Sequence, residues 1–120
     1  MRTLHSFKYA FAGIKHAIHN HQNMKIHLVA SIAALVLALI LRIPGVEFLL
    51  VIFAIMFVIF AEMVNTAIEE MTDLITTEHR QQAKVAKDIA AASVLIASLF
   101  SIIVAIVIFL PPLWNALSGS

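Results

Sequence analysis

No charged side chain interrupts the 22 residues from Ile89 to Leu110. A helix needs roughly 20 predominantly apolar residues to cross the hydrocarbon core of a bilayer, so this run is long enough to span it. Two further apolar stretches cover residues 26–41 and 48–68. The sequence therefore predicts an all-α membrane protein with three transmembrane helices, at 26–41, 48–68 and 89–110.

The composition also favours a membrane protein over a soluble one. Of the 120 residues, 62% are hydrophobic and 12% are charged, and the mean hydropathy is +0.98. The chain has no cysteine, which excludes disulfides, thiolate metal sites and cysteine nucleophiles. We interpret residues 1–120 as a single membrane domain, and we expect no nucleic-acid partner.

Lysine and arginine are distributed unevenly between the segments that connect the apolar stretches. Four precede the first stretch: Arg2, Lys8, Lys15 and Lys25. Three lie between the second and the third stretch: Arg80, Lys84 and Lys87. The short connection between the first two stretches has only Arg42. By the positive-inside rule, the N-terminus and the 70–87 loop face the cytosol, while the C-terminus lies outside.

The N-terminal segment, residues 1–24, has apolar residues at spacings of three and four. They are Leu4, Phe7, Phe11, Ile14 and Ile18. This pattern predicts an amphipathic helix on the membrane surface, which would act as a wall of a nearby site or as a basic anchor.

Prolines mark two predicted boundaries. Pro44-Gly45 predicts a tight turn between the first two spans. Pro111-Pro112 predicts the end of the third helix, because proline lacks the N–H that a helix interior requires.

The second apolar stretch carries a carboxylate into the membrane. Its uncharged part, 48–61, has only 14 residues, so the helix must continue through Glu62 and Asn65 to complete the span. Ionisable groups at such a depth are costly and are usually functional. Spacings of three, four and four residues place four polar side chains on one helical face. They are Glu62, Asn65, Glu69 and Asp73.

These residue types suit proton transfer and metal-nucleotide binding. A deep glutamate such as Glu62 can act as a base, and shallower carboxylates such as Glu69 can hold Mg²⁺ together with phosphates. For Glu70 and Asp73, a solvated helix end is the alternative interpretation. Near the third span, Lys87 can meet phosphate charge, and Asp88 either caps the helix or binds a nucleotide hydroxyl or a metal.

The motifs that these residues form resemble those of the prokaryotic diacylglycerol kinase and undecaprenol kinase family. They are Glu-Met-Val-Asn-Thr-Ala-Ile-Glu at 62–69, Asp-Leu at 73–74 and Ala-Lys-Val-Ala-Lys-Asp-Ile-Ala-Ala at 83–91. Residues 7–14 and 23–28 also look like that family's N-terminal signature. The resemblance covers nearly the whole chain.

This resemblance implies a small lipid kinase in the bacterial inner membrane that works as a homotrimer, with active sites shared between neighbouring subunits. ATP and Mg²⁺ would arrive from the cytosol and the lipid alcohol through the bilayer. Glu62 would be the general base for the lipid hydroxyl, Asn65 would orient the reacting groups, and Glu69 would hold Mg²⁺. The nucleotide-binding residues that the resemblance implies are Tyr9, Glu69, Asp73, Lys87 and Asp88.

One position departs from the family pattern. Eight residues after Gly13 the family carries a glutamate that helps to bind Mg²⁺, and this chain has His21. An imidazole can still be a metal ligand, but it prefers softer ions than Mg²⁺. We expect weaker Mg²⁺ binding, a changed metal preference, or compensation by an acid from another subunit. Three other histidines, His16, His27 and His79, are interpreted as interfacial or capping residues.

The motifs look closer to the undecaprenol kinase branch, so we predict phosphorylation of undecaprenol to undecaprenyl phosphate, with diacylglycerol to phosphatidic acid as the alternative. Two other classes stay open. One is a catalytically weak homologue with a regulatory or assembly role, which His21 makes plausible. The other is a small transporter that uses Glu62 for proton coupling, although it leaves Lys84, Lys87 and Asp88 without a role.

Overall fold

The computed structural model describes residues 2–75 and 81–119, and this part of the chain folds into four α-helices without a strand. The helices are α1 (Arg2–Asn20), α2 (Gln22–Ile40), α3 (Gly45–Ile75) and α4 (Gln81–Ser118). The predicted all-α fold is confirmed. His79 and Arg80 lie outside the described residues.

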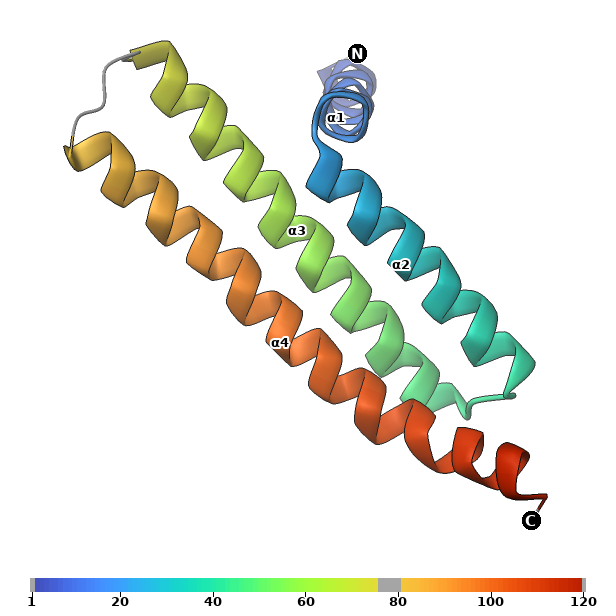
Figure 1. The fold of residues 1–120 in the computed structure, drawn as a ribbon. Helices are drawn as coiled ribbons and strands as arrows, with labels where there is room; N and C mark the ends of the chain where they lie inside the picture. The colour runs from blue at the N-terminus through green and yellow to red at the C-terminus, as the bar shows by residue number, and fades with distance from the viewer. Residues whose placement is uncertain (1, 76–80, 120) are drawn as a thin grey trace.

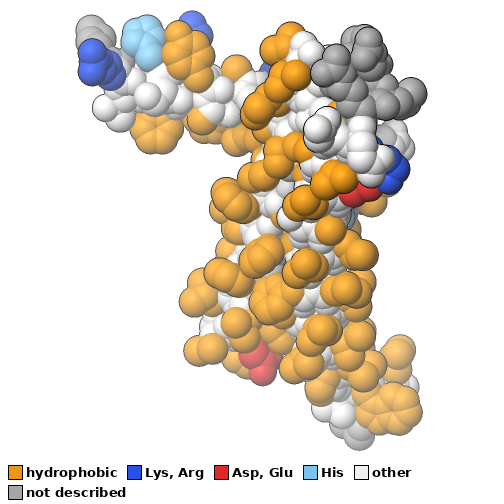
Figure 2. Space-filling model, turned by 90° about the vertical axis from the view of Figure 1, so that its left-hand side faces the viewer, with side chains coloured by type: hydrophobic (Ala, Val, Ile, Leu, Met, Phe, Trp, Pro, Cys, Tyr) orange, Lys and Arg blue, Asp and Glu red, His pale blue; other side chains and the backbone are white. Residues whose placement is uncertain are grey.

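Helices α2, α3 and α4 run side by side in alternating directions, with α3 in the middle (Figure 1). Helix α1 lies across one end of this bundle and projects away from it (Figure 1, Figure 2). Residue His21 has an extended backbone, with φ −125° and ψ 118°, so the chain turns a corner there and the first helix ends before residue 24.

The three bundle helices are each long and apolar enough to cross a membrane. Their large apolar side chains mostly point outward, and on the face shown in Figure 2 hydrophobic side chains cover the bundle while charged ones lie towards its ends. Such a surface suits lipid rather than water. The chain is therefore a multi-pass membrane protein, as the three apolar stretches predicted.

Small side chains allow α3 and α4 to approach closely near the middle of the bundle. Ala61 on α3 and Ala97 on α4 are buried in one cluster with Val58. Small residues at helix contacts are typical of membrane bundles, because the main gain there is close van der Waals packing. This packing holds the following turn of α3, which carries the polar residues, against its neighbours.

The chain reverses between α2 and α3 over residues 41–44, slightly before the predicted Pro44-Gly45 turn. Arg42 has a left-handed backbone with φ 54°, and the Ile43 N–H donates to the Ala38 carbonyl at 3.1 Å. This pattern closes the end of α2. Helix α3 then begins directly at Gly45.

The prediction that Pro111-Pro112 ends the last helix was wrong. Both prolines lie inside α4, which continues to Ser118. Each proline removes one backbone hydrogen bond, but its fixed φ is compatible with helical geometry, so the helix changes direction near its C-terminal end instead of stopping (Figure 1).

Candidate active site

The buried polar side chains lie on α3. Among residues 2–75 and 81–119, three polar side chains are buried: Glu62, Asn65 and Thr66. The Glu62 residue is only 2% exposed. Because α3 continues without a break to Ile75, the prediction that this helix carries Glu62 and Asn65 through the membrane-spanning segment is confirmed.

A cavity of about 110 Å³ opens beside these residues, between α3 and the start of α2. It is lined by His21, Gln22, Asn23, Glu62, Asn65, Thr66 and Glu69. Three candidate residues of the second span are thus brought together with His21, although 41 sequence positions separate His21 from Glu62.

Two buried oxygen atoms that accept no hydrogen bond lie on residues of the cavity wall. The Asn65 Nδ2 donates to Glu69 Oε1 at 3.2 Å, and this leaves Asn65 Oδ1 free. Within the described residues, Asn65 Oδ1 and Glu62 Oε2 are buried and accept no hydrogen bond. Buried oxygens are normally paired, so these two atoms point to a ligand. Together with the Glu69 carboxylate they form a set of hard oxygen donors that fits Mg²⁺.

The structure adds His27 to this site. Its Nε2 lies 3.6 Å from Glu62 Oε2, and the imidazole is 24% exposed. His27 lies inside α2, so it does not cap a helix; its side chain faces the buried carboxylate, and its interfacial position stays a prediction. The sequence spacing of His27 and Glu62 could not predict this contact, since the two residues belong to different helices.

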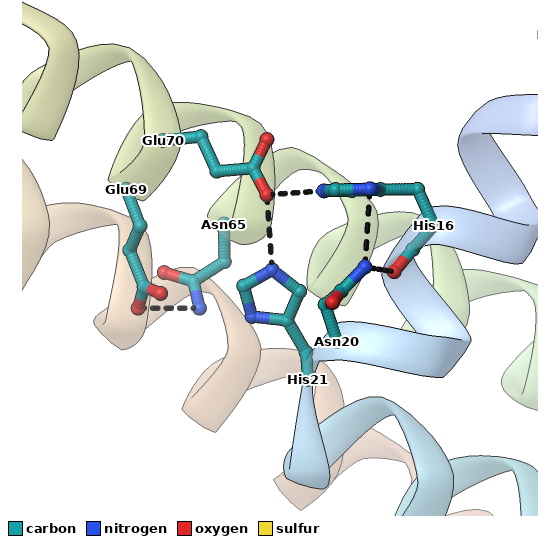
Figure 3. A network of polar contacts seen from close by, with 6 residues as sticks. All are labelled: His16, Asn20, His21, Asn65, Glu69 and Glu70. Carbon is teal, nitrogen blue, oxygen red and sulfur yellow. Dashed lines mark hydrogen bonds and ion pairs between the residues drawn. The ribbon is translucent and has the colours of Figure 1, made fainter.

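A second polar cluster lies beside the cavity (Figure 3). Glu70 Oε1 accepts hydrogen bonds from His16 Nε2 at 2.8 Å and from His21 Nε2 at 3.2 Å. Asn20 Nδ2 contacts His16 Nδ1 at 3.1 Å. His16 lies inside α1 and therefore does not cap a helix, while its interfacial position stays a prediction. His21 both lines the cavity and bonds to Glu70, and its role as an Mg²⁺ ligand stays a prediction.

The remaining candidates lie apart from the cavity lining. Lys87 Nζ donates to Asp73 Oδ1, which links α4 to α3. Lys84 pairs with Asp88 at 2.8 Å. Because α4 begins at Gln81, Asp88 lies well inside the helix and the capping alternative is wrong. Tyr9 is 71% exposed on α1, and no hydrogen bond or ring contact joins it to the other candidates in the described part of the chain.

The fold and the cavity together define an integral-membrane helical protein with a cavity lined by carboxylate and amide side chains. The family model for prokaryotic diacylglycerol kinase matches residues 8–109. This chain belongs to the prokaryotic diacylglycerol kinase family, a family of lipid kinases, and the predicted family is confirmed.

Individual relatives carry two different substrate names. The chain is 35% identical to the undecaprenol kinase of Bacillus subtilis over 112 residues, which are 93% of this chain and 91% of that protein. It is 32% identical to the diacylglycerol kinase of Escherichia coli over 114 residues, 95% of this chain and 90% of that one. A diacylglycerol kinase of Synechocystis is 34% identical over 109 residues, 90% of this chain but only 62% of that longer protein.

Proposed function

We propose that this protein transfers the terminal phosphoryl group of ATP to the hydroxyl group of a membrane lipid alcohol. The observation that carries the proposal is the buried Glu62 carboxylate, which shares a cavity with Glu69 at the end of an apolar bundle. A base at this depth can reach an alcohol that is dissolved in the bilayer, whereas a soluble acceptor would have to leave water to reach it. Membership of the lipid kinase family supports the same reaction.

In this reaction Glu62 accepts the proton of the lipid hydroxyl while that oxygen attacks the terminal phosphorus, and the bond to the bridging oxygen of ADP breaks. Asn65, which already bonds to Glu69, would orient the reacting groups. A Mg²⁺ ion held by Glu69 and the unpaired Asn65 oxygen would neutralise phosphate charge. Lys87, with Asp73, Asp88 and Tyr9, would complete nucleotide binding as the family resemblance implies.

For the acceptor we propose undecaprenol, with diacylglycerol as the alternative. The Asn-Thr-Ala-Ile-Glu motif at 65–69 and the undecaprenol kinase among the relatives support the first, and the relatives named diacylglycerol kinase support the second. A largely apolar groove of about 370 Å³ on the bundle includes His27 in its lining. Since His27 also contacts Glu62, a lipid chain in this groove would bring its hydroxyl close to the base.

We further propose that the 1–120 domain assembles as a homotrimer in the bacterial inner membrane, with 26–41, 48–68 and 89–110 as its spans. The distribution of lysine and arginine supports a cytosolic N-terminus and active site, with the C-terminus outside. Exposed apolar residues of α1, among them Phe7 and Phe11, support a position of this helix on the membrane surface.

The test is transfer of the terminal phosphate of ATP by the purified protein in mixed micelles, with undecaprenol and diacylglycerol offered side by side. Removal of a general base costs roughly 10²- to 10⁴-fold, so Glu62→Gln is expected to lose at least about 100-fold in rate. Glu47→Gln, at the opposite end of the same helix, is the matched control and is expected to retain activity.

Two outcomes would contradict the proposal. Transfer to neither lipid with Mg²⁺, Mn²⁺ or Zn²⁺ would favour a catalytically weak homologue with a regulatory or assembly role. Movement of a solute across vesicles without ATP hydrolysis, lost in Glu62→Gln, would favour a small proton-coupled transporter.

A further inference from the structure

We propose that His16, His21 and Glu70 form a binding site for a transition-metal ion such as Zn²⁺, which shares only His21 with the lining of the proposed Mg²⁺ cavity. The three side chains come from α1, from the corner between α1 and α2, and from α3 (Figure 3). One potential ligand atom from each residue lies within 4.8 Å of the other two.

The two separations that involve Glu70 are close to those of a metal site. Glu70 Oε1 lies 2.8 Å from His16 Nε2 and 3.2 Å from His21 Nε2. In a tetrahedral zinc site with bonds of about 2.0–2.2 Å, ligand atoms lie about 3.4 Å apart. The two hydrogen bonds therefore need to lengthen by about 0.2–0.6 Å for an ion to replace their protons, and the two imidazole nitrogens, which lie within 4.8 Å of each other, need to settle at a similar separation.

The donor set selects the kind of ion. Two imidazoles and one carboxylate are a ligand set found in zinc enzymes, with a fourth position left for water. Imidazole nitrogen suits Zn²⁺, Ni²⁺ and Cu²⁺, whereas Mg²⁺ prefers an oxygen shell and keeps much of its water. We therefore expect this cluster to reject Mg²⁺, in contrast to the oxygen-lined cavity beside it.

Asn20 contacts both the ring and the backbone of His16. Its Nδ2 lies 3.1 Å from His16 Nδ1 and donates to the His16 carbonyl at 2.9 Å. Metal binding at Nε2 places the ring proton on Nδ1, and rotation of the Asn20 amide would present its oxygen to that proton in exchange for the bond to the His16 carbonyl. Such partners hold a ligating imidazole in the required orientation and tautomer.

This site is distinct from Glu69 although it includes the next residue. Successive residues of a helix point about 100° apart at 3.6 residues per turn, so Glu69 and Glu70 face different neighbours. Glu69 bonds to Asn65, while Glu70 bonds to the two histidines. An ion at Glu70 would tie α1 to α3 and would hold His21, which is part of the cavity wall.

The test is cobalt binding by the full-length protein in detergent micelles, after treatment with a chelator and without ATP or lipid. The visible absorption of Co²⁺ reports tetrahedral coordination by protein ligands. We expect one Co²⁺ per chain, displaced by Zn²⁺ and not by excess Mg²⁺. His16→Ala and Glu70→Gln should each weaken binding at least tenfold, whereas His19→Ala on the same helix should not.

Two further variants separate a lost ligand from a lost fold and from the neighbouring site. Glu70→His presents three imidazoles, a known zinc ligand set, and should keep a tight site. Glu69→Gln should bind Co²⁺ like the unmodified protein. Loss of binding in Glu69→Gln but not in Glu70→Gln would assign the ion to the Mg²⁺ cavity and overturn the proposal, as would absence of Co²⁺ and Zn²⁺ binding. Neither result depends on the kinase reaction.

Discussion

His27→Ala removes the imidazole whose Nε2 lies 3.6 Å from the buried Glu62 Oε2. If Glu62 is the base of the reaction, this substitution should slow phosphoryl transfer, because the imidazole holds the carboxylate in place. The contact is slightly longer than a hydrogen bond and is expected to tighten when the substrates close the site. Binding of ATP should change little, because no nucleotide-binding candidate contacts His27 in the described residues.

The size of the effect follows from the geometry. An imidazole N–H that donates to the Glu62 carboxylate would form a hydrogen bond to a charged group, and such bonds contribute about 1.5–3 kcal/mol. Since about 1.36 kcal/mol corresponds to tenfold in rate, kcat should fall roughly 10- to 150-fold.

The assay is lipid phosphorylation in mixed micelles at saturating lipid, with ATP varied to separate kcat from KM. His27→Gln keeps a polar group and should recover part of the rate. Ser31→Ala is the matched control, because Ser31 lines the same groove one turn along α2 and donates only to the His27 carbonyl, at 2.7 Å. A kcat for His27→Ala within twofold of the unmodified enzyme, or an equal loss in Ser31→Ala, would refute the reasoning.

Three other substitutions test the turn, the packing and the metal. Arg42→Gly should raise the free energy of unfolding by about 1 kcal/mol, because φ is 54° at this position and glycine has no Cβ to be strained there. Thermal unfolding in micelles measures this change. Arg42→Ala is the control and should give no gain, because alanine keeps the Cβ. Ala97→Leu should cost about 1–3 kcal/mol in the same measurement, because Ala97 is 0% exposed, whereas the same change at the exposed Ala92 should be tolerated. His21→Glu should lower the Mg²⁺ concentration for half-maximal activity roughly tenfold, as expected for one added charge-assisted contact. An unchanged dependence of activity on the metal ion would contradict both the expected weak Mg²⁺ binding and the expected change in metal preference.

Local patterns were sufficient to predict the class of fold and the helix that carries the candidate base. The uncharged run at 89–110 indicated a membrane span by its length alone. The shortness of the run at 48–61 required a helix through Glu62, and α3 has that extent. The shared face of Glu62, Asn65 and Glu69 follows from the helical repeat, and all three line one cavity.

Local rules failed where a neighbouring element or the rest of a helix outweighed them. Proline usually ends a helix, yet α4 continues through Pro111-Pro112. Each proline removes only one backbone hydrogen bond, and the helical turns before and after the pair keep theirs. Asp88 looked like a possible cap because the apolar run starts next to it, but the polar residues from Gln81 onward are already helical. Hydropathy marks the membrane span and not the helix end.

The sequence by itself determined that this chain has three apolar helices, that one of them carries a carboxylate into the membrane, and that its motifs are those of a lipid kinase family. These properties depend on consecutive residues or on one helical repeat. Only the tertiary structure decided that His27 faces Glu62 and that His16 and His21 meet at Glu70. Those contacts join residues on different helices, so they depend on how the helices pack and turn, which spacing along one chain does not encode.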